Sequence, residues 1–258
     1  MSGTTRGRKL AIGCGGAGVV LAVLGTVAFI ALDEPRPRAE PTAEAEARVD
    51  RVQGALHADA WERTGAVSFT FSVTGTRHLW DRTRHFARTQ WDDLEAQVDL
   101  DEPTRGVAFR GGTRLEGEEA REVVRTGWER FINDSFWLAA PYKMRDGGTS
   151  RALVTLEGEE WILVSYASGG VTPGDAYAWR IGEDGTPTAW RMWVQVLPVG
   201  GAEATWEDWV TLPTGARLAR RRVAGPVTME MRDLMAAETL TQLVPGPDPF
   251  ALLESRAQ

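Results

Sequence analysis

The residue types that most often transfer protons or bind transition metals are scarce in this chain, which has 3 histidines and 1 cysteine among its 258 residues. His57 stands apart from the other two histidines in the sequence. On one extended strand, His78 and His85 would point to opposite faces, and Asp81 would share a face with His85 about 13 Å away. Neither pair therefore forms a local metal site or an acid–base dyad, and partners on neighbouring strands stay open.

Sequence motifs of enzymes are also missing. The chain has no G-x-S-x-G nucleophile turn, no glycine-rich phosphate loop and no C-x-x-C pair. Glu157, Glu159 and Glu160 could act as a carboxylate cluster, but a solvated hairpin turn around Gly158 explains them better. The sequence therefore predicts no metal, no cofactor and no enzymatic activity.

Two groups of charged residues could recognise a ligand. Arg217 and Arg220–Arg222 could attract an anionic headgroup, although a solvated strand edge is the simpler interpretation, because charged side chains protect such edges from aggregation. Asp134, Lys143 and Asp146 could form a polar rim at the mouth of a cavity. Helix-end and turn chemistry explains the same residues equally well, since Asp146 precedes two glycines, and both interpretations stay open.

Aromatic residues dominate the apolar part of the composition, with 11 tryptophans against 3 tyrosines. Tryptophan combines a large apolar area with one N–H donor, so it suits a core or an apolar cavity. The net charge of −7 argues against a nucleic-acid partner. The residues that we expect to line an apolar cavity are Phe69, Phe71, Trp128, Phe131, Phe136, Trp137, Trp190, Met192 and Trp206. Their spacing predicts burial only, so a filled core stays an alternative.

The N-terminal region predicts a membrane anchor. Residues 10–32 carry no charge, and about 20 apolar residues suffice to span a bilayer. Basic residues precede this stretch and acidic residues follow it, which places residues 1–9 in the cytoplasm and the rest of the chain outside. We therefore expect a single-pass signal-anchor of the cell inner membrane, with the C-terminal domain in the periplasm.

Two other interpretations of the N-terminus were weighed. A cleaved signal peptide, with a weak site at Thr26–Ala28, would leave a soluble periplasmic protein. A lipoprotein signal would modify Cys14, but the apolar stretch follows Cys14 where such a signal needs it to precede the cysteine. Residues 33–45 are rich in proline and charge, and are expected to form a disordered linker.

The rest of the chain alternates as strands do. Val67, Phe69, Phe71 and Val73 alternate with serine and threonine, which predicts a half-buried antiparallel strand. Further strands are expected at 77–91, 94–100, 106–110, 151–156, 160–167, 175–182, 187–197, 203–212, 216–223 and 227–232. Helical spacing of apolar residues predicts helices at 46–61 and 116–133.

These elements predict an α+β fold. Roughly ten strands joined by hairpins form a curved open antiparallel sheet, a half-barrel, with helices on its concave face. The domain is expected to cover residues 46–234, and residues 235–258 are expected to form a loosely packed tail.

Three stretches carry a resemblance to a known family: FINDSFWLAAPYKMRDGG (131–148), GGVTPGDAYAWRIGEDGTPTAWRMW (169–193) and TWEDWVTLPTGARLARRR (205–222). Together with the order of the elements, they make residues 46–232 similar to the LolA-like lipoprotein-carrier superfamily, in particular its poorly characterised outer-membrane-lipoprotein-sorting-like relatives. The resemblance implies a half-barrel whose cavity holds lipid acyl chains, and it carries over no catalytic residue.

The chain departs from the soluble carriers of that superfamily, which lose their signal peptide and shuttle across the periplasm. A protein that keeps its anchor cannot shuttle, so local binding, handover or sensing is favoured. We expect a domain that binds a lipid or lipoprotein acyl chain without catalysis. The alternative is a regulatory or sensor domain that binds a protein partner in the envelope.

Overall fold

The computed structural model describes residues 33–167, 174–195 and 199–254. The predicted cytoplasmic residues 1–9 and membrane span 10–32 lie outside the described residues. Within the described ranges, no helix combines the length and the apolar character that a membrane crossing requires.

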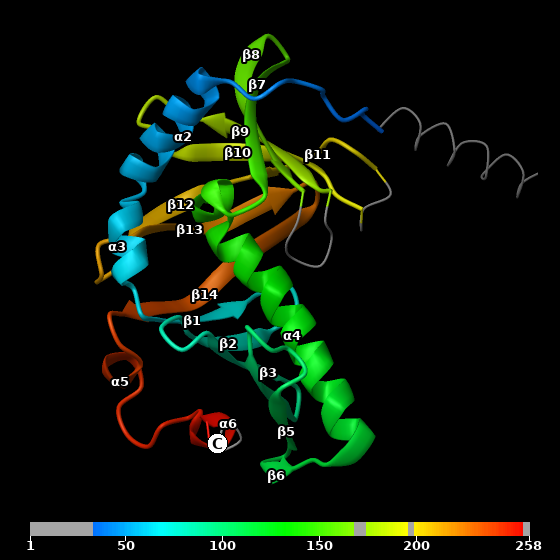
Figure 1. Cartoon of the computed structure of the whole chain (residues 1–258), viewed down its shortest axis with the longest axis vertical. Coiled ribbons are helices and arrows are strands. Elements are labelled where there is room, and N and C mark those ends of the chain that lie inside the picture. Colours follow the sequence, from blue (N-terminus) through cyan, green and yellow to red (C-terminus); the bar gives the residue numbers. More distant parts are fainter. Residues whose placement is uncertain (1–32, 168–173, 196–198, 255–258) are drawn as a thin grey trace, which may run out of the picture.

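The described residues form two antiparallel sheets (Figure 1). The larger sheet has nine strands in the order β12 (Glu207–Thr211), β13 (Arg217–Ala224), β14 (Val227–Ala237), β1 (Ala66–Phe71), β2 (Thr76–Asp81), β3 (Phe86–Trp91), β4 (Leu94–Asp99), β5 (Gly106–Arg110) and β6 (Thr113–Arg114). The smaller sheet has five strands in the order β11 (Ala202–Thr205), β10 (Pro187–Trp193), β9 (Ala176–Ile181), β8 (Glu159–Tyr166) and β7 (Thr149–Leu156). The expected α+β class with antiparallel strands is confirmed, but the expected single sheet of roughly ten strands is wrong, because the described strands form two sheets, neither of which closes into a barrel.

Two of the predicted strands are each divided in the structure. The stretch 77–91 contains β2 and β3, because the Asp81 carboxylate accepts hydrogen bonds from the backbone N–H groups of Thr83 and Arg84, at 3.1 Å each, and turns the chain. The stretch 203–212 breaks at Trp206, whose backbone N–H donates to the Thr188 carbonyl at 2.8 Å. Trp206 therefore stands where the chain passes from the smaller sheet to the larger one.

A long helix, α4 (Gly117–Ala139), crosses one face of the larger sheet and continues into a 3-10 helix, η1 (Ala140–Arg145) (Figure 1). The helix packs closely on β4, since a Cβ built on Gly127 would lie only 2.3 Å from the Ala96 Cβ. Apolar residues beyond the predicted end at 133 extend the helical stripe to Ala139. The predicted helix 46–61 is divided into α2 (Ala43–Ala55) and α3 (Ala58–Arg63) by His57, which has a positive φ of 56°.

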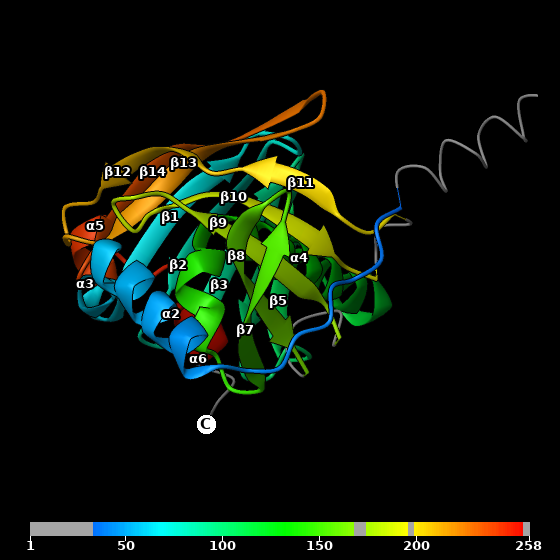
Figure 2. The same ribbon diagram turned by 90° about the horizontal axis from the view of Figure 1, so that it is seen from above.

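The prediction of a disordered linker at 33–45 is wrong for these residues. The segment runs beside the smaller sheet before α2 begins (blue in Figure 2). The Glu34 carbonyl accepts a hydrogen bond from Nε1 of Trp193 at 2.9 Å, and its carboxylate lies 3.2 Å from Nη1 of Arg191. Arg36 donates to Ser165 Oγ at 2.7 Å. Side chains of the small sheet thus fix the segment in place.

The prediction of a loosely packed tail is also wrong up to Glu254. After β14, the chain forms two short helices, α5 (Leu240–Leu243) and α6 (Ala251–Glu254). Phe250 and Leu253 are fully buried against Leu79 and Phe86 of the larger sheet. Arg84 also binds the Asp248 carboxylate, with Nη1 2.7 Å from Oδ2. The tail therefore covers the face of β2 and β3 that is opposite α4.

Candidate functional site

The largest group of aromatic rings surrounds Trp190 on β10. The ring centroid of Trp190 lies 4.9 Å from Trp137, 4.7 Å from Tyr177, 4.9 Å from Trp179 and 5.0 Å from Trp206. We call this group the Trp190 cluster, and its members are Phe136, Trp137, Tyr166, Tyr177, Trp179, Trp190 and Trp206. The cluster joins the smaller sheet to the end of α4.

Strand alternation and one helix end bring these rings together. Trp179 on β9 and Trp190 on β10 are direct partners in the sheet, so both rings stand on the same face. Phe136 and Trp137 belong to the last turn of α4 and are only partly buried. Trp206 reaches the cluster from the junction between β11 and β12. The cluster is therefore closed on one side by the half-buried rings of the helix.

The cluster contains more hydrogen-bond donors than acceptors. The indole N–H groups of Trp179, Trp190 and Trp206 are buried, and none has a hydrogen-bond partner among the described residues. A buried tryptophan N–H usually finds an acceptor, and an unpaired one calls for an explanation. Outside the cluster, Trp193 and Trp209 donate to backbone carbonyls at 2.9 and 3.1 Å. The buried N–H groups of Trp80, Trp128 and Trp161 also lack a partner in the described structure, so what distinguishes the cluster is that three such groups meet in it.

A fully buried arginine completes the site. Arg222 on β13 is 0% exposed, and its guanidinium carbon lies 4.1 Å from the centroid of the Trp206 ring. It donates to the carbonyls of Ala219 at 2.7 Å and Leu138 at 3.2 Å, while its Nε has no partner. Burial lowers the pKa of Arg222 to about 9, so the side chain remains charged at neutral pH.

No carboxylate among the described residues pairs with this buried charge. Its compensation comes from the Trp206 ring and from the carbonyl of Leu138, which belongs to the C-terminal turn of α4, the negative end of the helix dipole. The outward neighbours differ, because Arg220 pairs with Asp208 at 2.8 Å and Arg221 pairs with Glu207. The expected strand edge is therefore wrong, because β13 is paired on both sides by β12 and β14; Arg220 and Arg221 are solvated, and Arg222 is not.

The predicted cavity residues fall into three places. Phe136, Trp137, Trp190 and Trp206 lie in the Trp190 cluster, and Met192 lies in the same buried core. Phe69 and Phe71 are in that core too, whereas Phe131 is buried on α4, and the rings of Phe69 and Phe131 contact His78, at 4.8 and 5.7 Å between centroids. Trp128 lies in a separate group with Trp91, under the first half of α4. The sequence therefore predicted burial, but not which rings meet.

Asp134, one of the candidates for the polar rim, is buried and does not lie on an exposed rim. Its side chain is 3% exposed, and Oδ2 lies 2.8 Å from Nε2 of His78 on β2. The other imidazole nitrogen of His78 lies 3.2 Å from Oγ1 of Thr89. This buried chain of polar groups ties α4 to the sheet. The two residues are far apart in the sequence, and no local pattern pairs them.

The two other rim candidates pair with each other. Nζ of Lys143 lies 2.8 Å from Oδ2 of Asp146, and both side chains are exposed at the end of η1. Arg145 instead binds Glu46 and Asp50 on α2, at 3.0 and 2.5 Å. The two Arg145 pairs hold η1 next to α2, and in the described structure Lys143 and Asp146 pair with each other while Asp134 pairs with His78.

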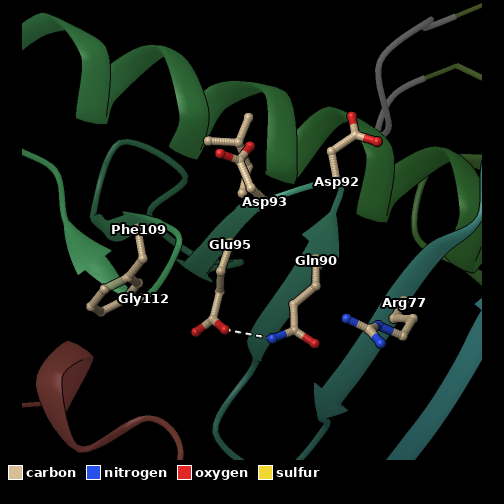
Figure 3. Close-up of a pocket in the computed structure, with 8 residues that line it drawn as sticks. Arg77, Gln90, Asp92, Asp93, Glu95, Phe109 and Gly112 are labelled. Carbon is tan, nitrogen blue, oxygen red and sulfur yellow. Dashed lines mark hydrogen bonds between the residues drawn. The ribbon is translucent and has the colours of Figure 1, made fainter.

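Two hollows in the surface of the described residues lie away from the predicted cavity. The larger, of about 410 Å³, opens near the turn between β3 and β4. Its charged and polar side chains include Arg77, Asp92 and Asp93, while Gln90 donates to Glu95 at 2.6 Å (Figure 3). The smaller lies between Arg84 and the C-terminal tail. Neither hollow is lined by a ring of the Trp190 cluster.

Little in the described part of the chain suggests a metal or hydrolytic centre. No group of three or more histidine, cysteine or acidic side chains is arranged to hold a metal ion there. Glu157 and Glu160 bind separate arginines, Arg191 and Arg48. No protein-family model matches the chain, and no curated protein matches it either.

Proposed function

We propose that this chain is an inner-membrane-anchored envelope protein that binds the acyl chain of a lipid or lipoprotein in the Trp190 cluster, without catalysis. In this proposal the two sheets form a half-barrel related to the lipoprotein carriers, and residues 10–32 form the anchor. The observation that carries the proposal is the meeting of three buried indole N–H groups without acceptors among the described residues, those of Trp179, Trp190 and Trp206, within one cluster of aromatic rings. Oxygen atoms of a bound amphiphile would supply those acceptors.

The composition of the cluster favours an apolar chain as the ligand. Aromatic rings offer large apolar areas at little cost in side-chain entropy, and ligand pockets are commonly lined by them with a few polar groups. Phe136 and Trp137 are partly exposed and lie on the last turn of α4. In this proposal a ligand enters between this turn and β10. The rings of Trp137 and Trp190 are in contact there and separate when the ligand binds.

The pairing of the polar side chains favours binding over catalysis. A catalytic constellation needs convergent polar groups that can reach a substrate. The buried His78 is bound to Asp134 and Thr89, with Phe69 and Phe131 against its ring. His85 and His57 are exposed and bind Asp101 and the Gly215 carbonyl respectively.

A photocrosslinker placed at Trp137 tests the proposal in the full chain. Benzoylphenylalanine is aromatic but larger than tryptophan, so it suits the partly exposed position 137, and Val73, which is 53% exposed after β1, serves as the control position. After irradiation of cells that produce each variant, mass spectrometry of the purified chain identifies the adduct. We expect a lipid or acylated adduct at 137 and none at 73. A protein adduct at 137 would favour the partner-binding alternative, and a photoactivated chain without an adduct would contradict lipid binding.

A further inference from the structure

Arg222 is set apart from the other arginines of its strand by what surrounds it. Arg220 and Arg221 are exposed and pair with Asp208 and Glu207. Arg222 is fully buried against Trp206, and it has only two carbonyl partners, on Ala219 and Leu138. A guanidinium has five N–H groups, so most of its donors, Nε included, are unused in the described structure.

A buried cation without a counter-ion lowers the free energy of unfolding. A charge that leaves water without a counter-ion loses hydration that two carbonyls and one ring restore only in part. A planar guanidinium with free N–H groups is suited to bind the two oxygens of a carboxylate or phosphate. The Trp206 ring holds this plane next to the other rings of the cluster, since Trp206 lies 5.0 Å from Trp190 and 5.2 Å from Trp179.

We infer that Arg222 binds the anionic head, a carboxylate or phosphate, of the amphiphile whose chain lies along the Trp190 cluster. This inference rests on the proposed function, and it names the ligand class. The ligand is an amphiphile, either a fatty acid or a phospholipid, with an oxyanion close to its acyl chain. The oxyanion neutralises Arg222 and accepts hydrogen bonds from its free N–H groups. A neutral amphiphile of equal chain length leaves those groups unpaired and binds less tightly.

A purely structural role for Arg222 is the competing explanation. Its hydrogen bond to Leu138 attaches the C-terminal turn of α4 to β13, and a cation there is favourable because of the helix dipole. This role predicts a loss of stability on substitution, but no preference for a charged ligand. Head-group preference therefore separates the two explanations.

The test compares three amphiphiles with the same brominated dodecyl chain and a carboxylate, phosphate or hydroxyl head. Bromine quenches tryptophan fluorescence on contact, so titration of the full chain in uncharged detergent micelles gives an affinity for each. In the wild type we expect the better of the two anions to bind about tenfold more tightly than the alcohol. The better anion also distinguishes a fatty acid from a phospholipid as the source of the head.

Variants at two positions of β13 complete the test. Arg222→Gln should reduce the preference for the anion to less than about twofold, while Arg222→Lys keeps part of it. Arg220→Gln, which removes an outward ion pair, should leave the preference unchanged. Equal affinity of anion and alcohol in the wild type, or an unchanged preference in a folded Arg222→Gln, would overturn the inference but leave the proposed function standing. Failure of all three amphiphiles to quench would overturn both.

Discussion

Nε2 of His78 lies 2.8 Å from Oδ2 of Asp134, and both side chains are almost completely buried between α4 and the larger sheet. Oδ1 of the same carboxylate accepts a hydrogen bond from Nδ2 of Asn133 at 2.9 Å. This pair lies where the long helix crosses β2, between the rings of Phe69 and Phe131. It attaches α4 to the sheet together with the hydrogen bonds from Arg130 to Thr76 Oγ1, at 3.0 Å, and from Arg222 to the Leu138 carbonyl.

Removal of the carboxylate should destabilise the protein. Asp134→Ala leaves His78 without its partner in a buried site, and we expect a loss of about 2–4 kcal/mol in the free energy of unfolding. Asp134→Asn keeps the shape and one hydrogen bond, so its loss should be smaller. Urea unfolding followed by circular dichroism measures both. An Asp134→Ala variant as stable as the wild type would show that the pair does not hold the helix.

The close approach of α4 to β4 can be tested with two glycines, each within a helix. A Cβ at Gly127 would lie 2.3 Å from the Ala96 Cβ, so Gly127→Ala forces the helix away from the strand and should cost about 1–3 kcal/mol. A Cβ at Gly54 on α2 meets nothing within 4 Å. Gly54→Ala should therefore stabilise the protein by about 0.5–1 kcal/mol. Unfolding free energies that move in the same direction for both variants would contradict this packing.

The segment that precedes α2 should be released when its arginine anchor is removed. Arg191 lies within 3.2 Å of Glu34 and also binds Glu203 at 3.0 Å and Glu157. Arg191→Met should therefore accelerate trypsin cleavage after Arg38, which is exposed on this segment. Arg220→Met removes an ion pair of another strand and should leave the cleavage rate unchanged. Equal rates in the two variants would show that the anchor is not needed.

The C-terminal tail should contribute less stability in acid. The hydrogen bond from Arg84 holds the pKa of Asp248 below its ordinary value of 3.8. The carboxylate therefore contributes fully to the free energy of unfolding above pH 3.8, and this contribution is lost as the pH falls through the lower pKa of the folded state. Asp248→Asn should cost up to about 1 kcal/mol near neutral pH. The difference between variant and wild type should shrink well below pH 3.8, and a difference independent of pH would contradict the role of the charge.

Alternation along the chain predicted most strands because one face of each sheet is buried. Val67, Phe69 and Phe71 follow this pattern on β1 and are buried. The turn between β2 and β3 was missed because it contains no glycine or proline, and the only local signal was the side chain of Asp81, which accepts hydrogen bonds from the turn. Chain breaks that depend on one polar side chain are hard to recognise within an alternating sequence.

Local sequence patterns could not predict the contacts that determine the site. Arg222 follows two outward arginines and looks like a third, and only the packing of the α4 end on β13 shows that it is buried. In the same way, the proline-rich segment 33–45 has the composition of a linker, but Trp193 and Arg191 of β10 bind it. Both cases depend on partners that are distant in the sequence, which composition alone cannot reveal.

Native mass spectrometry of the full chain, purified in an uncharged detergent, tests the central claim most directly. We predict a co-purified amphiphile that organic solvent releases, and that is lost in Trp137→Glu, where a charge replaces a half-buried ring of the Trp190 cluster. A folded wild-type chain that shows only its own mass, and that takes up no added fatty acid or phospholipid, would contradict lipid binding.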